Sequence, residues 1–136
     1  MSPIEVVLAD DEELALKQLR RLLASFPQVQ VVGEAHDGPE AVELIDRLEP
    51  GLVFLDVEMP VLNGFQVLKA IKHKPMAVVI TAHASYRQMA FETDAIDCLL
   101  KPVDMEQMER TMSKIEVLVE ATGRINRSRN ATALDR

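Results

Sequence analysis

Short aliphatic runs alternate with longer amphipathic stretches along this 136-residue chain. Five runs are rich in Val, Ile and Leu, which suits strands that are buried on both sides. We predict these strands over residues 4–9, 29–34, 52–55, 77–81 and 97–100. Strands that alternate with helices are typical of a parallel sheet covered on both faces. The pattern therefore predicts a single α/β domain.

Between the strands, apolar residues recur every three or four positions, which predicts helices. The first helix begins near Glu12 and is stopped by Pro27, and the second begins near Pro39, which suits a first helical turn. The expected buried stripes are Leu16, Leu19, Leu23 and Phe26 in the first helix and Val42, Ile45 and Leu48 in the second.

Three further helices are predicted in the second half of the chain. Gly64 opens a short third helix, and residues 85–88 (Ser-Tyr-Arg-Gln) have the spacing of a capping box that should start the fourth. Residues 104–107 (Asp-Met-Glu-Gln) should start the fifth in the same way. Core packing explains the spacing of apolar residues along the fifth helix, with a dimer or coiled-coil seam as the alternative. These residues are Met105, Met108, Met112, Ile115 and Val119.

Composition adds limits on function and location. The net charge of −7 argues against nucleic-acid binding through a broad basic surface. From Gly123 onward the chain holds four Arg and one Asp, so we interpret residues 122–136 as a disordered, polar basic tail or linker after a domain over 1–121.

Cys98 is the only cysteine, no signal peptide is evident, and no segment approaches the roughly 18 apolar residues of a membrane span. We therefore expect a cytoplasmic protein that does not enter a membrane.

Three aspartates follow the ends of predicted strands. Asp10 and Asp11 close the first run, and Asp56 closes the third. If these strands are adjacent and parallel, the three carboxylates meet in one pocket at the carboxyl edge of the sheet. Crowded carboxylates repel each other unless a cation joins them, and ligand sets made only of oxygen favour Mg²⁺. Each Asp alone could simply cap the next helix.

A hydroxyl and an ammonium group are expected at the same edge. Thr81-Ala82 ends the fourth run, and Lys101-Pro102 ends the fifth. Together with the carboxylates, these groups suit phosphoryl transfer to a carboxylate. In that interpretation Asp56 is the nucleophile, while Mg²⁺, Lys101 and Thr81 stabilise the transferring phosphoryl group.

Taken in order, these motifs resemble the receiver domain of bacterial two-component response regulators. The motifs are Asp10-Asp11, residues 56–64 (Asp-Val-Glu-Met-Pro-Val-Leu-Asn-Gly), Thr81-Ala82 and Lys101-Pro102. The resemblance runs from about Ile4 to about Ala121. It implies a flavodoxin-like, doubly wound (βα)5 three-layer sandwich with a parallel five-stranded sheet in the order 2-1-3-4-5. It also implies a signalling domain that is not a conventional enzyme and that a sensor histidine kinase phosphorylates on Asp56.

The resemblance also implies roles for individual residues. Asp11 and Asp56 would supply side-chain ligands to Mg²⁺, the backbone carbonyl of Glu58 would supply another, and Asp10 would act partly through water. Lys101 would pair with Asp56 and later with its phosphate. The bond from Lys101 to Pro102 would be cis.

The resemblance implies an output surface formed by the fourth helix, the fifth strand and the fifth helix, and homodimerisation through that surface. Residues 90–102 (Ala-Phe-Glu-Thr-Asp-Ala-Ile-Asp-Cys-Leu-Leu-Lys-Pro) are similar to receivers whose output is a LytTR-type DNA-binding domain. Cys98 departs from the family, which usually has Tyr or Phe there, so coupling by rotation of that ring is not available. Asp94 replaces a common Gly or Asn and should tolerate a left-handed turn.

Positions two residues after Asp56 and Thr81 are occupied by Glu58 and His83. In receivers these positions flank the path of the hydrolytic water, so we predict that both residues tune the lifetime of the phosphorylated state. The alternative is that both are ordinary exposed loop residues.

Two other functions fit parts of the sequence. A Mg²⁺-dependent phosphohydrolase with an aspartate nucleophile would need an acid/base carboxylate on the same loop, and residues 56–59 (Asp-Val-Glu-Met) supply only an imperfect copy. A flavin-binding module would need a Ser, Thr and Gly cradle for phosphate, but the first loop is Asp-Asp-Glu-Glu and would repel it.

Overall fold

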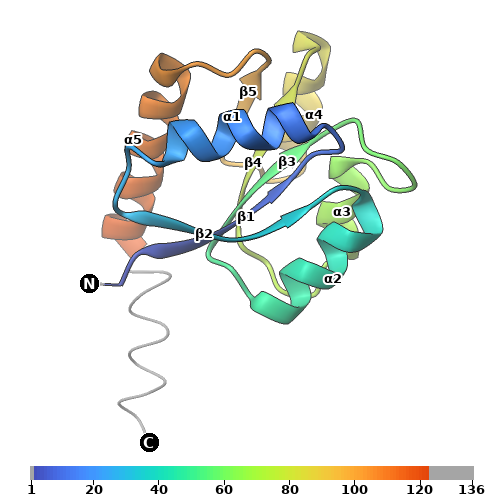
Figure 1. The fold of residues 1–136 in the computed structure, drawn as a ribbon, viewed down its shortest axis with the longest axis horizontal. Helices are drawn as coiled ribbons and strands as arrows, with labels where there is room; N and C mark the ends of the chain where they lie inside the picture. Colours follow the sequence, from blue (N-terminus) through green and yellow to red (C-terminus); the bar gives the residue numbers. More distant parts are fainter. Residues whose placement is uncertain (1, 123–136) are drawn as a thin grey trace, which may run out of the picture.

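The computed structural model describes residues 2–122 and consists of one parallel sheet between two layers of helices (Figure 1). The strands are β1 (Ile4–Ala9), β2 (Val29–Ala35), β3 (Leu52–Asp56), β4 (Met76–Thr81) and β5 (Asp97–Leu100). The helices are α1 (Glu13–Leu23), α2 (Gly38–Leu48), α3 (Gly64–Ala70), α4 (Arg87–Glu92) and α5 (Met105–Thr122). All strand pairs are parallel and the order is β2-β1-β3-β4-β5, which confirms the predicted topology.

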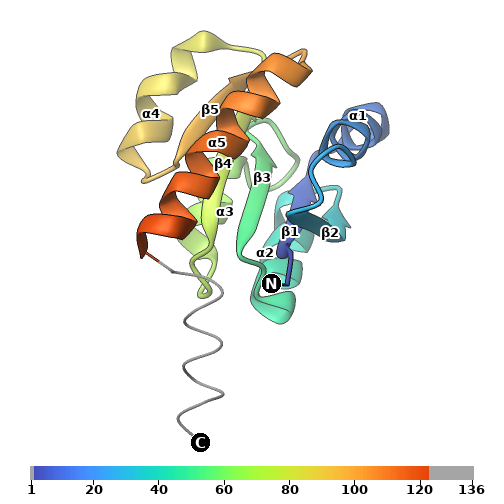
Figure 2. The same cartoon turned by 90° about the vertical axis from the view of Figure 1, so that its left-hand side faces the viewer.

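Helices α1 and α5 cover one face of the sheet, and α2, α3 and α4 cover the other (Figures 1 and 2). Alternate residues of a strand face opposite sides, so Val6 and Leu8 of β1 pack under α1 and α5, while Val7 packs under α2 and α3. The central strands are buried on both sides, which is why they are nearly continuous aliphatic runs.

The core on the α1 and α5 side is densely filled. Phe54, Met108 and Ile115 are almost completely buried there. Truncating a side chain of this kind to Ala costs about 2–5 kcal/mol of stability. The predicted core role of the apolar residues on α5 is confirmed, with Met105 and Val119 partly buried at its edges. This packing holds the carboxyl ends of the strands in fixed positions.

Some helix predictions need correction. Helix α1 ends at Leu23, so Phe26 lies in the following loop, although it still packs against the core. Helix α4 begins at Arg87, after a single 3₁₀ turn over Ala84–Tyr86, and no side chain caps it. The predicted capping box at 85–88 is therefore wrong. Ser85 lies within the 3₁₀ turn rather than in the extended conformation that an N-cap residue adopts.

The start of α5 agrees in part with the prediction. The side chain of Asp104 accepts a hydrogen bond from the backbone N–H of Gln107 at 2.9 Å. The side chain of Gln107 bonds instead to the backbone of Leu100, so the reciprocal half of the box is absent. In α2 the expected Val42 and Leu48 are only partly buried, and the buried positions are Gly38, Ala41, Leu44 and Ile45.

Within residues 2–122, no helix is both long and apolar enough to cross a membrane. The bond between Lys101 and Pro102 is cis, and Asp94 has a φ of 63°, as predicted for each. Of the predicted tail over 122–136, only Thr122, the last residue of α5, lies within the described residues.

Candidate functional site

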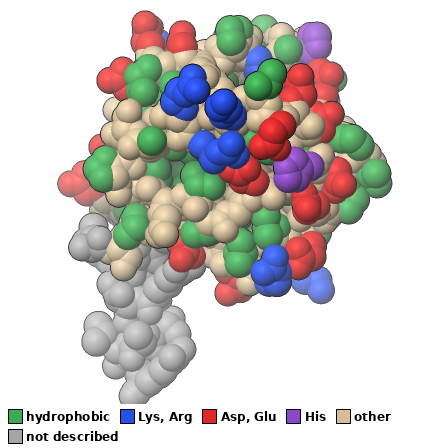
Figure 3. All heavy atoms as spheres, viewed as in Figure 1, with side chains coloured by type: hydrophobic (Ala, Val, Ile, Leu, Met, Phe, Trp, Pro, Cys, Tyr) green, Lys and Arg blue, Asp and Glu red, His purple; other side chains and the backbone are tan. Residues whose placement is uncertain are grey.

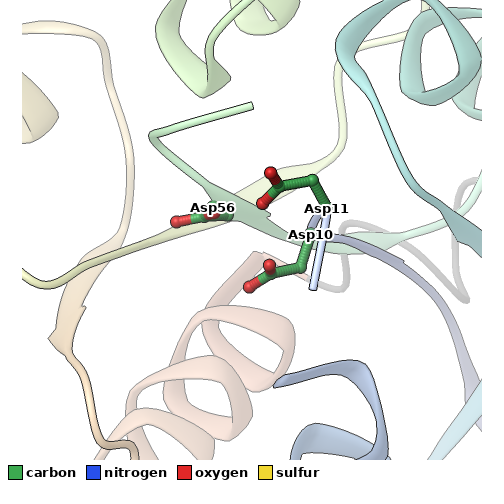
Figure 4. Close-up of side chains that lie close together, drawn as sticks. All are labelled: Asp10, Asp11 and Asp56. Atoms are coloured by element: carbon green, nitrogen blue, oxygen red, sulfur yellow. The ribbon is translucent and has the colours of Figure 1, made fainter. Parts of the chain in front are cut away.

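The three predicted carboxylates meet at the carboxyl edge of the sheet. Asp10 and Asp11 follow β1, and Asp56 ends β3. These strands are adjacent and parallel, with Ala9 opposite Leu55, so their ends lie side by side. One carboxylate oxygen from each Asp lies within 4.8 Å of the others (Figure 4). The predicted convergence of the carboxylates is confirmed.

Asp10 is completely buried. Its Oδ1 accepts a hydrogen bond from the backbone N–H of Glu12 at 2.9 Å. Among the described residues, the partner of its Oδ2 is Nζ of Lys101, 2.9 Å away as an ion pair. A buried carboxylate oxygen without a full set of partners is unfavourable, so this atom is well placed to interact with a cation.

Lys101 extends from the end of β5 over the carboxylates. Its Nζ lies 2.9 Å from Asp10 Oδ2, 3.4 Å from Glu12 Oε1 and 3.5 Å from Asp56 Oδ1. The family resemblance implied a pair with Asp56, but in this structure Asp10 is the closer partner. Burial lowers the pKa of Lys101, but the neighbouring carboxylates of Asp10 and Asp56 outweigh it and raise that pKa. The ammonium group therefore stays charged.

Asp56 is only 4% exposed, and its environment disfavours a negative charge. Burial and then the charge of Asp10 raise the pKa of Asp56 to about 7, against the opposing effects of Lys101 and the backbone N–H of Glu58. Near neutral pH a proton and a metal ion would compete to neutralise this cluster. The donor set is entirely carboxylate, which suits a hard divalent cation such as Mg²⁺.

An open cavity of about 370 Å³ lies beside the carboxylates. It is lined by Asp11, Glu12, Asp56, Glu58, Ala82 and Lys101. The cavity is large enough to admit a phosphoryl group, and both acidic and basic side chains reach it.

The fourth strand brings Thr81 and His83 to the same edge. Thr81 is buried at the end of β4, next to β3, and its Oγ1 accepts a hydrogen bond from the backbone N–H of His83 at 3.0 Å. Nε2 of His83 lies 3.0 Å from Oε1 of Glu58, and both side chains are 58% exposed. These two residues, predicted from their positions in the sequence, therefore face each other.

The loop after β3 returns close to Asp56. A Cβ atom at Gly64 would lie 2.6 Å from the backbone oxygen of Asp56, which is too close for any residue but glycine. The backbone N–H of Gly64 donates a hydrogen bond to the carbonyl of Val57 at 2.9 Å. The start of α3 is thereby fixed against the end of β3.

Comparison with known proteins agrees with this geometry. Residues 6–113 match the family described as the response regulator receiver domain. The chain belongs to this family. Receiver domains act as phosphorylation switches in two-component signalling, so membership of this family favours a signalling role over the phosphohydrolase and flavin-binding alternatives.

Similar curated proteins are also response regulators. Over 114 residues the receiver is 38% identical to an uncharacterized response regulatory protein of Vibrio cholerae, covering 82% of this chain and 48% of that protein. It is 39% identical to the sensory transduction protein LytT of Bacillus anthracis, covering 82% and 46%, respectively. It is 35% identical to the transcriptional regulatory protein BtsR of Escherichia coli K12, covering 82% and 48%. The chain thus spans about half the length of these relatives.

Solved receiver domains have the same fold. The response regulatory domain of protein mrkE from Klebsiella pneumoniae aligns with a TM-score of 0.79 and 29% identity, covering 88% of this chain and all (100%) of that one. The REC domain of AraT from Geobacillus stearothermophilus aligns with a TM-score of 0.79 and 30% identity, covering 89% and 98%.

Cys98 in this receiver is a buried apolar residue. It is 8% exposed and packs with Val57, Phe65 and Val79. Burial raises the pKa of its thiol, which disfavours the reactive thiolate.

Two residues near the receiver site were not predicted as part of it. Glu12 lines the cavity and lies near Lys101, and its position directly after the Asp pair was a usable signal. Gln107 holds the end of β5 through hydrogen bonds to the N–H and carbonyl of Leu100 and to the carbonyl of Pro102. These partners are all backbone groups, which every residue type has, so the sequence gives no sign of this role.

Proposed function

We propose that this receiver is a phosphorylation-dependent signalling switch whose phosphoacceptor is Asp56. The observation that carries the proposal is the placement of Asp56 at a buried strand end, beside two carboxylates and the ammonium group of Lys101. Response regulators receive their phosphoryl group from sensor histidine kinases, and we propose such a kinase as the donor here.

The acidic cluster fits Mg²⁺. In this proposal Asp11 and Asp56 provide side-chain ligands, Asp10 acts partly through water, and the Glu58 backbone carbonyl supplies another ligand. Support comes from the oxygen-only donor set, from the incompletely satisfied Oδ2 of Asp10 and from the raised pKa of Asp56. When bound, Mg²⁺ would offset the charge of the carboxylates and of the transferring phosphoryl group.

The transfer step uses residues of this chain in three roles. An oxygen of the Asp56 carboxylate forms a bond to phosphorus, while the bond from phosphorus to the donor histidine nitrogen breaks and its electron pair stays on the imidazole. Lys101 then pairs with the phosphoryl oxygens, and the Thr81 hydroxyl donates a hydrogen bond to one of them. The small side chain of Ala82, which lines the cavity, leaves room for the group.

The chain acts on no separate substrate in this proposal. It catalyses only its own phosphorylation and a slow hydrolysis in which water attacks the phosphorus and Asp56 leaves as a carboxylate. Glu58 and His83 set the lifetime of the phosphorylated state, because their paired side chains lie beside the cavity that the water must enter.

A kinase domain has a suitable docking place beside this cavity. A second hollow, of about 390 Å³, adjoins it between α1 and the loop after β5 and shares Glu12 and Lys101 with it. Leu14 of α1 lines this hollow and is 81% exposed. Because Asp56 itself is buried, a donor histidine must be held at this edge of the sheet to reach it.

The output surface in this proposal is the face formed by α4, β5 and α5. Phe91 of α4 is 57% exposed and Val117 of α5 is 63% exposed, which supports phosphorylation-dependent homodimerisation there. We propose that residues 1–121 form the receiver and that residues 122–136 are a polar basic tail or linker. In this proposal the switch regulates an output domain or partner in transcription control, and the resemblance of residues 90–102 favours an output of the LytTR type.

We expect this chain itself to bind no nucleic acid and to act in the cytoplasm, where response regulators are typically found. Its net charge is −7. On the face that carries α1, Lys and Arg side chains form a small central group and a few lie near the edges, interspersed with acidic side chains (Figure 3). A protein that binds DNA through its surface would instead need many phosphate contacts.

Intact-protein mass after incubation with Mg²⁺ and acetyl phosphate tests the proposal. We expect one phosphoryl addition to the wild type and none to Asp56→Asn or to wild type with a chelator. If Mg²⁺ binds and the protein is folded but neither acetyl phosphate nor any histidine kinase phosphorylates it, the proposed switch is wrong.

A further inference from the structure

The usual aromatic position on β5 holds Cys98, but an aromatic side chain is still present beside it. Cys98 packs in a small cluster with Val57, Phe65 and Ala90. Tyr86, from the 3₁₀ turn before α4, is partly buried against the same cluster. Its ring centroid lies 5.9 Å from that of Phe65, with the ring planes inclined by 51°. An aromatic ring therefore occupies this region from a different element.

Tyr86 is connected to the phosphoacceptor site by a short series of contacts. Its backbone N–H donates a hydrogen bond to the carbonyl of His83 at 3.1 Å. The N–H of His83 in turn donates to Oγ1 of Thr81 at 3.0 Å. The rings of His83 and Tyr86 are 6.2 Å apart in an edge-to-face arrangement, and the His83 ring pairs with Glu58 at 3.0 Å. A displacement of Thr81 therefore acts directly on the turn that carries Tyr86.

Tyr86 also attaches α4 to the core at the N-terminal end of the helix. The helix has only six residues, and only Ala90 of these is buried. Tyr86 immediately precedes Arg87, the first residue of the helix, and its ring packs on Phe65. A helix with so little buried surface has few contacts to hold it when its N-terminal anchor moves.

We propose that Tyr86 is the positioning residue that transmits phosphorylation of Asp56 to α4, in place of an aromatic residue at position 98. The inference rests on the proposed function. When the Thr81 hydroxyl turns toward a phosphoryl oxygen on Asp56, the bond from the His83 N–H draws the 3₁₀ turn toward β3. The Tyr86 ring then moves deeper between Phe65 and the small side chain of Cys98, and α4 moves with it.

The composition of the chain makes a direct test available. Tyr86 is the only tyrosine and the sequence has no tryptophan, so tyrosine emission from the full chain reports this residue alone. Acrylamide is a suitable quencher because it is neutral and does not respond to the added charge. With Mg²⁺ and acetyl phosphate, we expect acrylamide quenching to fall about twofold as the ring becomes more buried in the phosphorylated population. The same treatment should leave Asp56→Asn unchanged.

A second measurement separates transmission from a merely structural role. Amide hydrogen exchange of residues 87–92 is compared with and without acetyl phosphate in wild type, Tyr86→Phe and Tyr86→Ala. Because Phe keeps the ring, we expect Tyr86→Phe to retain the phosphorylation-dependent change and Tyr86→Ala to lose most of it. All three should still gain one phosphoryl group by intact mass. Tyrosine quenching in the wild type remains decisive if Tyr86→Ala does not fold.

The outcomes distinguish this inference from the proposed function. Wild type that is phosphorylated by mass but shows unchanged tyrosine quenching overturns the role of Tyr86 and leaves the phosphoacceptor assignment intact. The same holds if Tyr86→Ala keeps the full exchange response of α4. Wild type that accepts no phosphoryl group from acetyl phosphate or a kinase overturns both.

Discussion

The acidic pocket and the α4 region lie on the same domain but are built in different ways. The pocket stands on the ends of buried strands, and its central side chains, Asp10 and Asp56, are almost fully buried. Helix α4 has only Ala90 buried and displays Phe91 and Met89 to solvent. The two regions therefore suit different roles. The fixed site carries out the chemistry, and the loosely attached helix changes position in response.

The largest expected effect concerns the pocket, where the buried charge of Asp56 should lower the stability of the folded protein. The pKa of this carboxyl is about 7 in the folded protein and near its ordinary value of 3.8 in the unfolded chain. Its ionisation therefore removes stability as pH rises from about 4 to about 7. In a chelator, we expect Asp56→Asn to be more stable than wild type by on the order of 2–4 kcal/mol at pH 8, and the difference to shrink toward pH 4.

Denaturant unfolding at several pH values measures this difference. The matched control is Asp104→Asn, which changes an exposed capping carboxylate to another good cap and should show little dependence on pH. If the extra stability of Asp56→Asn over the wild type does not increase with pH, the charge of Asp56 is not destabilised by burial.

The next effect concerns the ammonium group of the pocket. Lys101→Ala removes the cation that lies near both Asp10 and Asp56, so we expect phosphorylation by acetyl phosphate to slow by about 100-fold. Lys114→Ala is the control, because Lys114 pairs with Asp97 away from the pocket. Intact mass measured over time gives the phosphorylation rate of each variant. Equal rates for both variants would show that Lys101 has no role in the transfer step.

A smaller effect is expected at the exposed rim of the pocket. Glu58→Ala and His83→Ala each break the 3.0 Å pair between these side chains, and we expect the phosphorylated state to decay with a rate changed by about threefold to tenfold. Decay is followed after acetyl phosphate is removed. If the phosphorylated state of both variants decays at the wild-type rate, Glu58 and His83 are ordinary surface residues.

The smallest effect on stability should come from α4. Phe91 is exposed, so Phe91→Asp should change the free energy of unfolding by only about 0.5 kcal/mol or less. The same variant should lose phosphorylation-dependent dimerisation, measured by analytical ultracentrifugation, while Glu109→Asp on the exposed surface of α5 should keep it. A phosphorylated Phe91→Asp that dimerises normally would place the interface elsewhere.

Much of the fold could be predicted from the sequence because each central strand is a nearly continuous apolar run with a polar residue at or just after its end. The same feature located Asp10, Asp11, Asp56, Thr81 and Lys101, since the carboxyl ends of parallel strands must lie along one edge. The strand order itself came from the family resemblance.

Other features could not be deduced because they depend on three-dimensional distances or on backbone partners. The closer approach of Lys101 to Asp10 than to Asp56 is set by how the end of β5 is placed. A 3₁₀ turn stands before α4 where a capping box was predicted, and Tyr86 in this turn packs on Phe65, a contact between elements distant in sequence.

The central claim is that Asp56 and neither of its acidic neighbours carries the phosphoryl group. Borohydride reduces an aspartyl phosphate to homoserine with loss of phosphate, so peptide mapping after this treatment identifies the phosphorylated residue. We predict homoserine at position 56 alone, in wild type treated with Mg²⁺ and acetyl phosphate. Homoserine at position 10 or 11, or phosphorylated protein without homoserine at 56, would contradict it.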